Sequence, residues 1–164
     1  MLTSEFNDEY QDWLEGTGNA KLQAPAWFSR TLGEIQHAPP LSVSPVASIA
    51  TAVDAMNEHH QTAVLVVEAG RVIGIFTERD VLTRVVPQAV DARETAVRTL
   101  MTPDPETLRE STLLSAALRQ LTLSGYHHLP VVDARGEPRA LVSPQTIMRS
   151  LLDAFPTEIM HAPP

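Results

Sequence analysis

The sequence repeats itself, since an apolar pattern of the first half recurs 65 positions later in the second half. The pattern consists of apolar residues at the spacing of one helix face. These residues are Ile49, Val53 and Met56 in the first half, and Leu114, Leu118 and Leu121 in the second. Self-similarity at a fixed offset indicates that one supersecondary unit is used twice. We therefore expect two similar structural units in tandem.

The offset continues into an apolar run that follows each predicted helix. Residues 62–68 match residues 127–133, and both runs have the composition of a buried strand. A turn follows each run, at residues 69–70 and 134–136. The second turn is one residue longer, so the offset becomes 66, and residues 74–80 then match residues 140–146.

Each half is thus predicted to form a short strand, a helix, two strands and a second helix. The short first strands are expected near Ser42–Val43 and Thr107–Leu108, after Pro40 and Pro105. The second helices carry Val81, Leu82 and Val85 in the first half, and Ile147, Met148 and Leu151 in the second. This succession predicts a mixed α/β (α+β) fold made of two tandem β-α-β-β-α units.

Four segments follow from this pattern. They are an N-terminal helical extension at 1–36, a first repeat at 37–98, a second repeat at 99–155 and a C-terminal tail at 156–164. Within the extension, Phe28, Leu32 and Ile35 predict a helix over 26–36 that leads into the core and ends before Pro39 and Pro40. An earlier helix face at Phe6, Tyr10, Trp13 and Leu14 has two open partners, the chain's own core and a second subunit.

The composition is that of an ordinary soluble domain, with 43% hydrophobic and 20% charged residues. A net charge of −8 disfavours nucleic acid, because such binding depends on neutralising phosphates. The acidic first fifteen residues do not resemble a signal peptide, and no apolar stretch approaches the roughly 20 residues of a membrane helix. The absence of cysteine fits a reducing compartment. We expect a cytoplasmic protein without a nucleic-acid or membrane partner.

Two such repeats closely resemble the CBS-domain pair, also called a Bateman module. The motif Gly-Ile-Phe-Thr-Glu-Arg-Asp at 74–80 carries the resemblance, and Tyr-His-His-Leu-Pro-Val-Val-Asp at 126–133 strengthens it. The resemblance covers about residues 38–155. It implies a pseudo-two-fold pair of repeats with two clefts for adenosine compounds such as AMP, ADP, ATP or S-adenosylmethionine. It also implies dimerisation and the regulation of a partner protein.

Gly74, Thr77 and Asp80 form the predicted centre of the first cleft. Gly74 has no side chain, so a ligand can approach the strand backbone closely. Thr77 lies at a helix start that favours a phosphate, and Asp80 offers two acceptor oxygens to the ribose hydroxyls. The same Thr-x-x-Asp spacing is a variant of the capping box, in which both side chains satisfy backbone donors. Both roles stay open here, and they can coexist.

The resemblance extends the site to the residues around this centre, with adenine between the first short strand and the start of the next strand. The predicted ligand-binding set is Ser42, Val43, Thr62, Ala63, Gly74, Ile75, Phe76, Thr77, Arg79, Asp80, His127 and His128. Arg79, His127 and His128 are the expected phosphate contacts, and strand alternation lets at most one of the two histidines face the cleft. The histidines lack metal-site spacing, so no metal is expected.

The second motif departs from the first. Ala140 replaces the glycine and Thr146 replaces the aspartate, whereas Ser143 keeps a hydroxyl. Ser143 followed by Pro144 still predicts a helix start. Because the ribose acceptor is missing, we expect one strong site per chain and a weak or empty second cleft.

A nucleotide-responsive regulator is therefore the leading hypothesis, with an adenine nucleotide as regulatory ligand and no required cofactor. The alternative is a dimerisation or interaction scaffold with unoccupied clefts. An enzyme is not expected, because no catalytic arrangement emerges at informative spacing. A homodimer is expected, because each small repeat must cover its apolar helix face. The regulated partner is unidentified.

Overall fold

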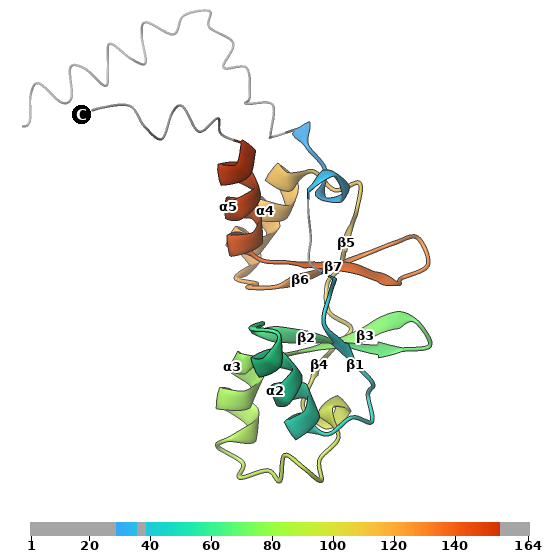
Figure 1. Ribbon diagram of the computed structural model, residues 1–164, viewed down its shortest axis with the longest axis vertical. Coiled ribbons are helices and arrows are strands. Elements are labelled where there is room, and N and C mark those ends of the chain that lie inside the picture. Colours follow the sequence, from blue (N-terminus) through green and yellow to red (C-terminus); the bar gives the residue numbers. More distant parts are fainter. Residues whose placement is uncertain (1–28, 36–38, 155–164) are drawn as a thin grey trace, which may run out of the picture.

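The computed structural model describes residues 29–35 and 39–154 (Figure 1). The helix face predicted within residues 1–25 and the tail at 156–164 lie outside the described residues. Each half of the described chain builds its own β-sheet with helices on one side, and the two sheets lie one above the other in Figure 1. The predicted pair of mixed α/β units is therefore confirmed.

The first repeat contains a four-stranded sheet in the order β1-β2-β3-β4. Its elements are β1 (Ser42–Val43), α2 (Ile49–Glu58), β2 (Ala63–Glu68), β3 (Arg71–Thr77), α3 (Glu78–Asp80), the π-helix η3 (Val81–Val85), η4 (Val97–Thr99) and β4 (Thr102–Pro103). Strand β1 pairs parallel with β2, and β2 pairs antiparallel with β3. The predicted turn joins β2 to β3, and both Ala69 and Gly70 have positive φ angles there.

The second repeat contains a three-stranded sheet in the order β5-β6-β7. Its elements are β5 (Leu108–Arg109), α4 (Leu114–Ser124), β6 (Leu129–Val132), β7 (Pro138–Val142) and α5 (Pro144–Ala154). The pairing repeats that of the first sheet, parallel for β5 with β6 and antiparallel for β6 with β7. Strand β6 begins at Leu129, so His127 and His128 precede it instead of lying within it.

Segments that precede each repeat are exchanged between the repeats. The 3₁₀ helix η2 (Leu32–Glu34) comes before the first repeat, yet Leu32 and Ile35 are buried in the core of the second. Helix η4, which packs with the first repeat, is the counterpart of η2 at the repeat offset and leads into the sheet of the second repeat, and its Val97 is buried in the core of the first. Leu32 and Val97 are 65 positions apart, so the repeat offset includes these segments.

The helix predicted over 26–36 is wrong where the structure describes it, because residues 31 and 35 flank a three-residue 3₁₀ helix in extended conformations. The backbone is instead hydrogen-bonded to the second repeat. The backbone N–H of Leu32 donates to the carbonyl of Thr112 at 2.8 Å, and the backbone N–H of Gly33 donates to the backbone carbonyl of Glu110 at 2.8 Å. These donors cannot also serve a longer helix. The expectation that this segment reaches the core is confirmed by Leu32, which is fully buried.

The predicted apolar faces of α2 and α4 pack against the sheets of their own repeats. Ile49 and Met56 are buried in the first core, and Leu114 and Leu121 in the second. These faces are therefore covered within one chain, and they do not require a dimer. A third, smaller cluster of Ala63, Leu65 and Ile75, with Leu141 packed against it, joins the two sheets.

Candidate functional site

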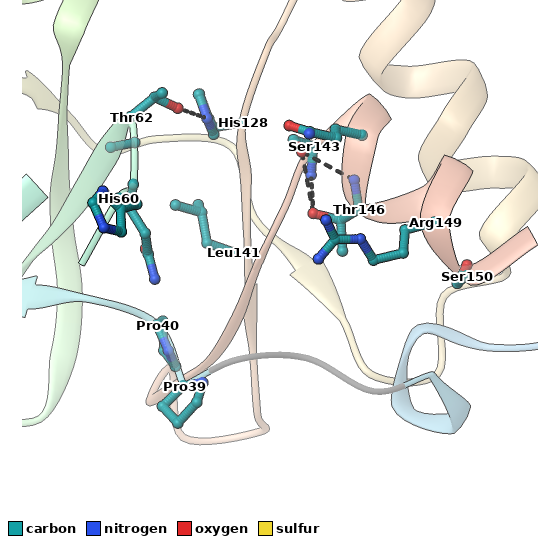
Figure 2. A pocket seen from close by; sticks show the side chains of 13 residues that line it. Pro39, Pro40, His60, Thr62, His128, Leu141, Ser143, Thr146, Arg149 and Ser150 are labelled. Atoms are coloured by element: carbon teal, nitrogen blue, oxygen red, sulfur yellow. Dashed lines mark hydrogen bonds between the residues drawn. The ribbon is translucent and has the colours of Figure 1, made fainter. Parts of the chain in front are cut away.

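A cavity of about 590 Å³ lies between the two repeats (Figure 2). We call it the inter-repeat cavity. Its lining residues are Pro39, Pro40, His60, Gln61, Thr62, Ala63, His128, Leu141, Ser143, Gln145, Thr146, Arg149 and Ser150. The volume lies within the range of about 300–1,000 Å³ that is usual for small-molecule sites.

The ends of strands and the start of one helix bring these residues together. The first repeat contributes the segment before β1, with Pro39 and Pro40, and the residues around the start of β2, with Thr62 and Ala63. The second repeat contributes the end of β7 and the face of α5 (Figure 2). Alternation along β7 turns Leu141 towards the cavity, because its neighbours in the strand are buried in the core.

A hydrogen bond joins the two repeats at the cavity. The Thr62 hydroxyl oxygen lies 2.9 Å from Nε2 of His128 (Figure 2). Burial lowers the pKa of His128, and the charge of neighbouring His127 lowers it further. His128 is therefore neutral at pH 7, and it contributes a polar group without a fixed charge.

The start of α5 is capped within the wall of the cavity. The backbone N–H of Thr146 donates to Oγ of Ser143 at 3.2 Å, and the two hydroxyl oxygens lie 3.1 Å apart. The predicted helix start at Ser143 and Pro144 is thus confirmed. Arg149 lies one helical turn beyond Thr146, and in Figure 2 its side chain extends back towards Thr146.

Thr77 and Asp80 form a capping box at the start of α3. Asp80 Oδ2 accepts from the backbone N–H of Thr77 at 2.9 Å and from its hydroxyl at 2.7 Å. The other carboxylate oxygen, Oδ1, pairs with Nη1 of Arg84 at 3.3 Å, and Asp80 is only 6% exposed. The carboxylate therefore stabilises the helix start in this structure.

Gly74 provides room for a neighbouring side chain. It pairs with Pro103 of β4, and a Cβ atom at Gly74 would lie 2.2 Å from Sδ of Met101. The side chain of Met101 thus occupies the space that the missing side chain leaves. Ala140, the counterpart of Gly74, is buried in the second core and is not among the residues that line the inter-repeat cavity.

Some residues of the predicted ligand-binding set line the inter-repeat cavity, and the others lie outside its lining. Thr62, Ala63 and His128 line the inter-repeat cavity. The predicted residues outside its lining are Ser42, Val43, Gly74, Ile75, Phe76, Thr77, Arg79, Asp80 and His127. Val43 and Phe76 pack in the first core, and Ile75 packs between the sheets. Ser42, Arg79 and His127 are exposed.

The lining residues that sequence reasoning missed come mainly from the second repeat. Leu141, Gln145, Arg149 and Ser150 were not predicted, because they surround the second motif, which has Thr146 in place of the aspartate on which the predicted site depends. A usable signal was present, since Thr146 and Arg149 are three residues apart and hence on one helix face.

Among residues 29–35 and 39–154, no group of three or more histidine, cysteine, aspartate or glutamate side chains could hold a metal ion. No helix in the described part of the chain is both long and apolar enough to span a bilayer.

The fold and the cavity define a class of protein, in which two mixed α/β repeats in tandem enclose a cleft at their strand ends. The CBS domain family matches this chain twice, at residues 32–87 and 97–153. The chain belongs to the CBS domain family, as a protein with two CBS repeats.

Similar proteins include a 17.7 kDa protein of Acidianus ambivalens, 33% identical over 112 residues, which are 68% of this chain and 66% of that protein. The CBS domain-containing protein CBSCBSPB1 of Arabidopsis thaliana is 31% identical over 140 residues. That match covers 79% of this chain but only 26% of the plant protein.

Among solved structures, the CBS-pair protein CBSX2 of Arabidopsis thaliana in complex with AMP is 26% identical to this chain. The match has a TM-score of 0.65 and covers 76% of this chain and 97% of CBSX2.

Proposed function

We propose that this chain is a non-catalytic regulatory module that binds an adenine nucleotide, AMP, ADP or ATP, in the inter-repeat cavity. The observation that carries the proposal is that residues of both repeats line one cavity, whose volume of about 590 Å³ is large enough for a nucleotide. The likeness to CBSX2, which has been solved with AMP, supports an adenine ligand.

The lining residues suit the two parts of such a ligand. Pro40 and Leu141 offer apolar surface to a purine ring, and backbone groups at the start of β2 can bond its edge. The hydroxyls of Ser143 and Thr146 lie at the beginning of α5, where polar groups of ribose or phosphate can be bonded.

A ligand in this position would contact both repeats at once. It would stabilise one relative packing of the repeats, and a partner protein that binds this packing better would be regulated by the nucleotide. A cytoplasmic setting is part of the proposal, since a chain without cysteine needs no oxidising compartment.

The surroundings of Asp80 are the second candidate position for the same ligand. The predicted role of Asp80 as ribose acceptor requires its carboxylate to exchange partners, because both oxygens are already bonded. In the inter-repeat cavity, Arg149 forms no ion pair with any residue that the structure describes, so its charge can bind a ligand without such an exchange, and we therefore give this cavity priority.

Calorimetric titration with AMP, ADP, ATP and GMP tests the proposal. At 100 times its Kd, a ligand stabilises the folded chain by about 2.7 kcal/mol, so thermal shifts give an independent readout.

Gln145→Trp would fill the cavity from an exposed position and should abolish adenine-nucleotide binding. Arg79→Trp is the matched control, because residue 79 occupies the same position in the first repeat. If Arg79→Trp alone removes binding, the ligand is bound beside Asp80. Equal shifts with adenine and guanine nucleotides, or none, would refute sensing.

We also propose a homodimer, supported by exposed apolar residues on the second helices. Leu82 and Val86 are 68% and 64% exposed, and their counterparts Met148 and Leu152 are 57% and 56% exposed. This surface is equally consistent with the alternative function, an interaction scaffold without a ligand. Titration separates the two, because a scaffold would dimerise and bind no nucleotide.

A further inference from the structure

The second helices of the two repeats expose apolar side chains at equivalent positions. Leu82 and Val86 in the first repeat correspond to Met148 and Leu152 in the second, at an offset of 66. All four side chains are more than half exposed. In Figure 1 the helices of both repeats lie at the left of the molecule, and the β2–β3 and β6–β7 turns lie at the right. Apolar burial alone would therefore allow either repeat to pack on either repeat of a second copy.

The helices of the first repeat carry an excess of negative charge. We call α2, α3 and η3 the first helix group, and it contains four acidic and two basic residues. Asp80 and Arg84 pair with each other. The other charged side chains of the group are exposed, and they are Asp54, Glu58, Glu78 and Arg79. Three exposed acidic side chains are thus opposed by one exposed arginine.

The helices of the second repeat carry the opposite excess. We call α4 and α5 the second helix group, and it contains Arg119 and Arg149 but one acidic residue, Asp153. Both arginines are exposed, and neither forms an ion pair with any residue that the structure describes. At the offset of 65, Arg119 corresponds to Asp54, so equivalent positions carry opposite charges. The two helix groups are therefore complementary in charge, although both expose apolar residues.

A two-fold dimer can join these helix groups in two ways. In a head-to-head dimer, each helix group faces the same group of the second copy, because a two-fold axis relates identical surfaces. In a head-to-tail dimer, each first group faces the second group of the other copy, and this contact occurs twice. Head-to-head pairing brings like charges together, which disfavours it, whereas head-to-tail pairing brings opposite charges together.

We propose that two copies of this chain pair head to tail, so that the first helix group of one copy packs on the second helix group of the other. The proposal rests on the homodimer proposed above and specifies which repeats meet. The exposed apolar residues supply the buried area, and the exposed charges determine the orientation.

Cross-linking of introduced cysteines tests this arrangement, because the chain contains no cysteine of its own. Leu82→Cys and Met148→Cys each place one thiol on an exposed position of one helix group. Each variant is treated alone with a short bismaleimide, and both are treated together after co-expression as differently tagged full chains. We expect strong cross-linking between the two different chains and little within either variant alone. Val46→Cys, at a 72% exposed loop position, measures cross-linking by random collision.

Each outcome separates the arrangement from the homodimer itself. Cross-linking of each variant with its own copies, as strong as in the mixture, would show head-to-head pairing and overturn the proposal while leaving the homodimer intact. A dimer that cross-links no more than Val46→Cys would also overturn it, because another surface would then join the copies. A monomeric mass of the parent chain by light scattering would refute both the arrangement and the homodimer. Nucleotide titration tests the ligand separately.

An exchange of two charges gives a second test that leaves the inter-repeat cavity unchanged, since Asp54 and Arg119 are not among its lining residues. Arg119→Asp should raise the Kd of the dimer about two- to tenfold, because it places acidic side chains on both helix groups. Adding Asp54→Arg restores opposite charges and should return the Kd to that of the parent chain. Analytical ultracentrifugation measures these values.

Added salt distinguishes the two arrangements without any substitution. It should weaken a head-to-tail dimer, because it screens the attraction between the helix groups, and it should strengthen a head-to-head dimer. A Kd that falls with salt, or a second substitution that fails to rescue the first, would contradict the head-to-tail arrangement.

Discussion

The hydroxyl of Thr62 and the imidazole of His128 are 2.9 Å apart, and they connect the two repeats across the inter-repeat cavity. Because burial lowers the pKa of His128 below 6.5, the unfolded chain takes up a proton more readily than the folded chain. The stability contributed by neutral His128 is thus present above about pH 6.5 and is lost as the pH falls through the lower folded-state pKa. Urea unfolding between pH 8 and pH 5 should show this loss.

His128→Gln should make this pH dependence shallower, since glutamine can still bond Thr62 but does not titrate. His59→Gln is the control, because His59 is exposed and lies outside the cavity. Identical pH slopes for the parent chain and His128→Gln would contradict the assignment.

Asp80→Ala should destabilise the chain by about 1–2 kcal/mol, because it removes the acceptor of the capping box and the ion-pair partner of Arg84, which keeps only its hydrogen bond to the carbonyl of Leu100. Thr146→Ala, the matched change in the second repeat, should cost less, since it removes only hydroxyl contacts. Urea denaturation measures both. A larger loss of nucleotide affinity than of stability in Asp80→Ala would instead favour the ribose role.

Gly74→Ala should destabilise the first repeat by about 1–3 kcal/mol, because the added methyl group would overlap with Met101. Removing the obstructing side chain in the double variant Gly74→Ala, Met101→Ala should make the two changes non-additive in a double-mutant cycle. Strict additivity of the two free energies would show that the two residues do not compete for space.

Leu32→Ala should cost about 2–5 kcal/mol, because Leu32 is fully buried in the core of the second repeat. Val97→Ala is the counterpart for the first repeat. Amide hydrogen exchange should become faster in the second repeat for Leu32→Ala and in the first repeat for Val97→Ala. Loosening confined to residues 39–90 in Leu32→Ala would refute the exchange of segments.

The double variant Leu82→Lys, Met148→Lys should convert the proposed homodimer into a monomer, because it places charges on the apolar surface of the second helices. Light scattering at micromolar concentration measures the mass. Val46→Lys is the control, since Val46 is 72% exposed but lies on a loop. A monomeric parent chain would show that this surface serves another purpose.

The repeat order was predictable because apolar periodicity is a local property of the sequence. The spacing of residues such as Ile49 and Leu114 indicates a buried helix face, whatever path the rest of the chain takes. The structure of residues 29–35 was not predictable in this way, because its backbone partners, Glu110 and Thr112, lie in the second repeat.

The site was predictable only in part for a similar reason. Thr62 and His128 were identified from their own repeats, but the cavity combines the strand ends of one repeat with the helix start of the other. Gly74 matched a ligand motif, and its actual neighbour, Met101, is distant in sequence. Motif reasoning assigns chemistry to a segment, whereas tertiary structure decides which segments face each other.

The reciprocal placement of Leu32 and Val97 also bears on how a chain of this kind could arise. A polypeptide with a single copy of the unit would leave a gap in its own core, and only the leading segment of a second molecule could fill it. Such a chain would be folded only at concentrations that maintain the pair. Fusing two copies replaces that encounter with an intramolecular one at high effective concentration, so each leading segment is always near the core that it completes.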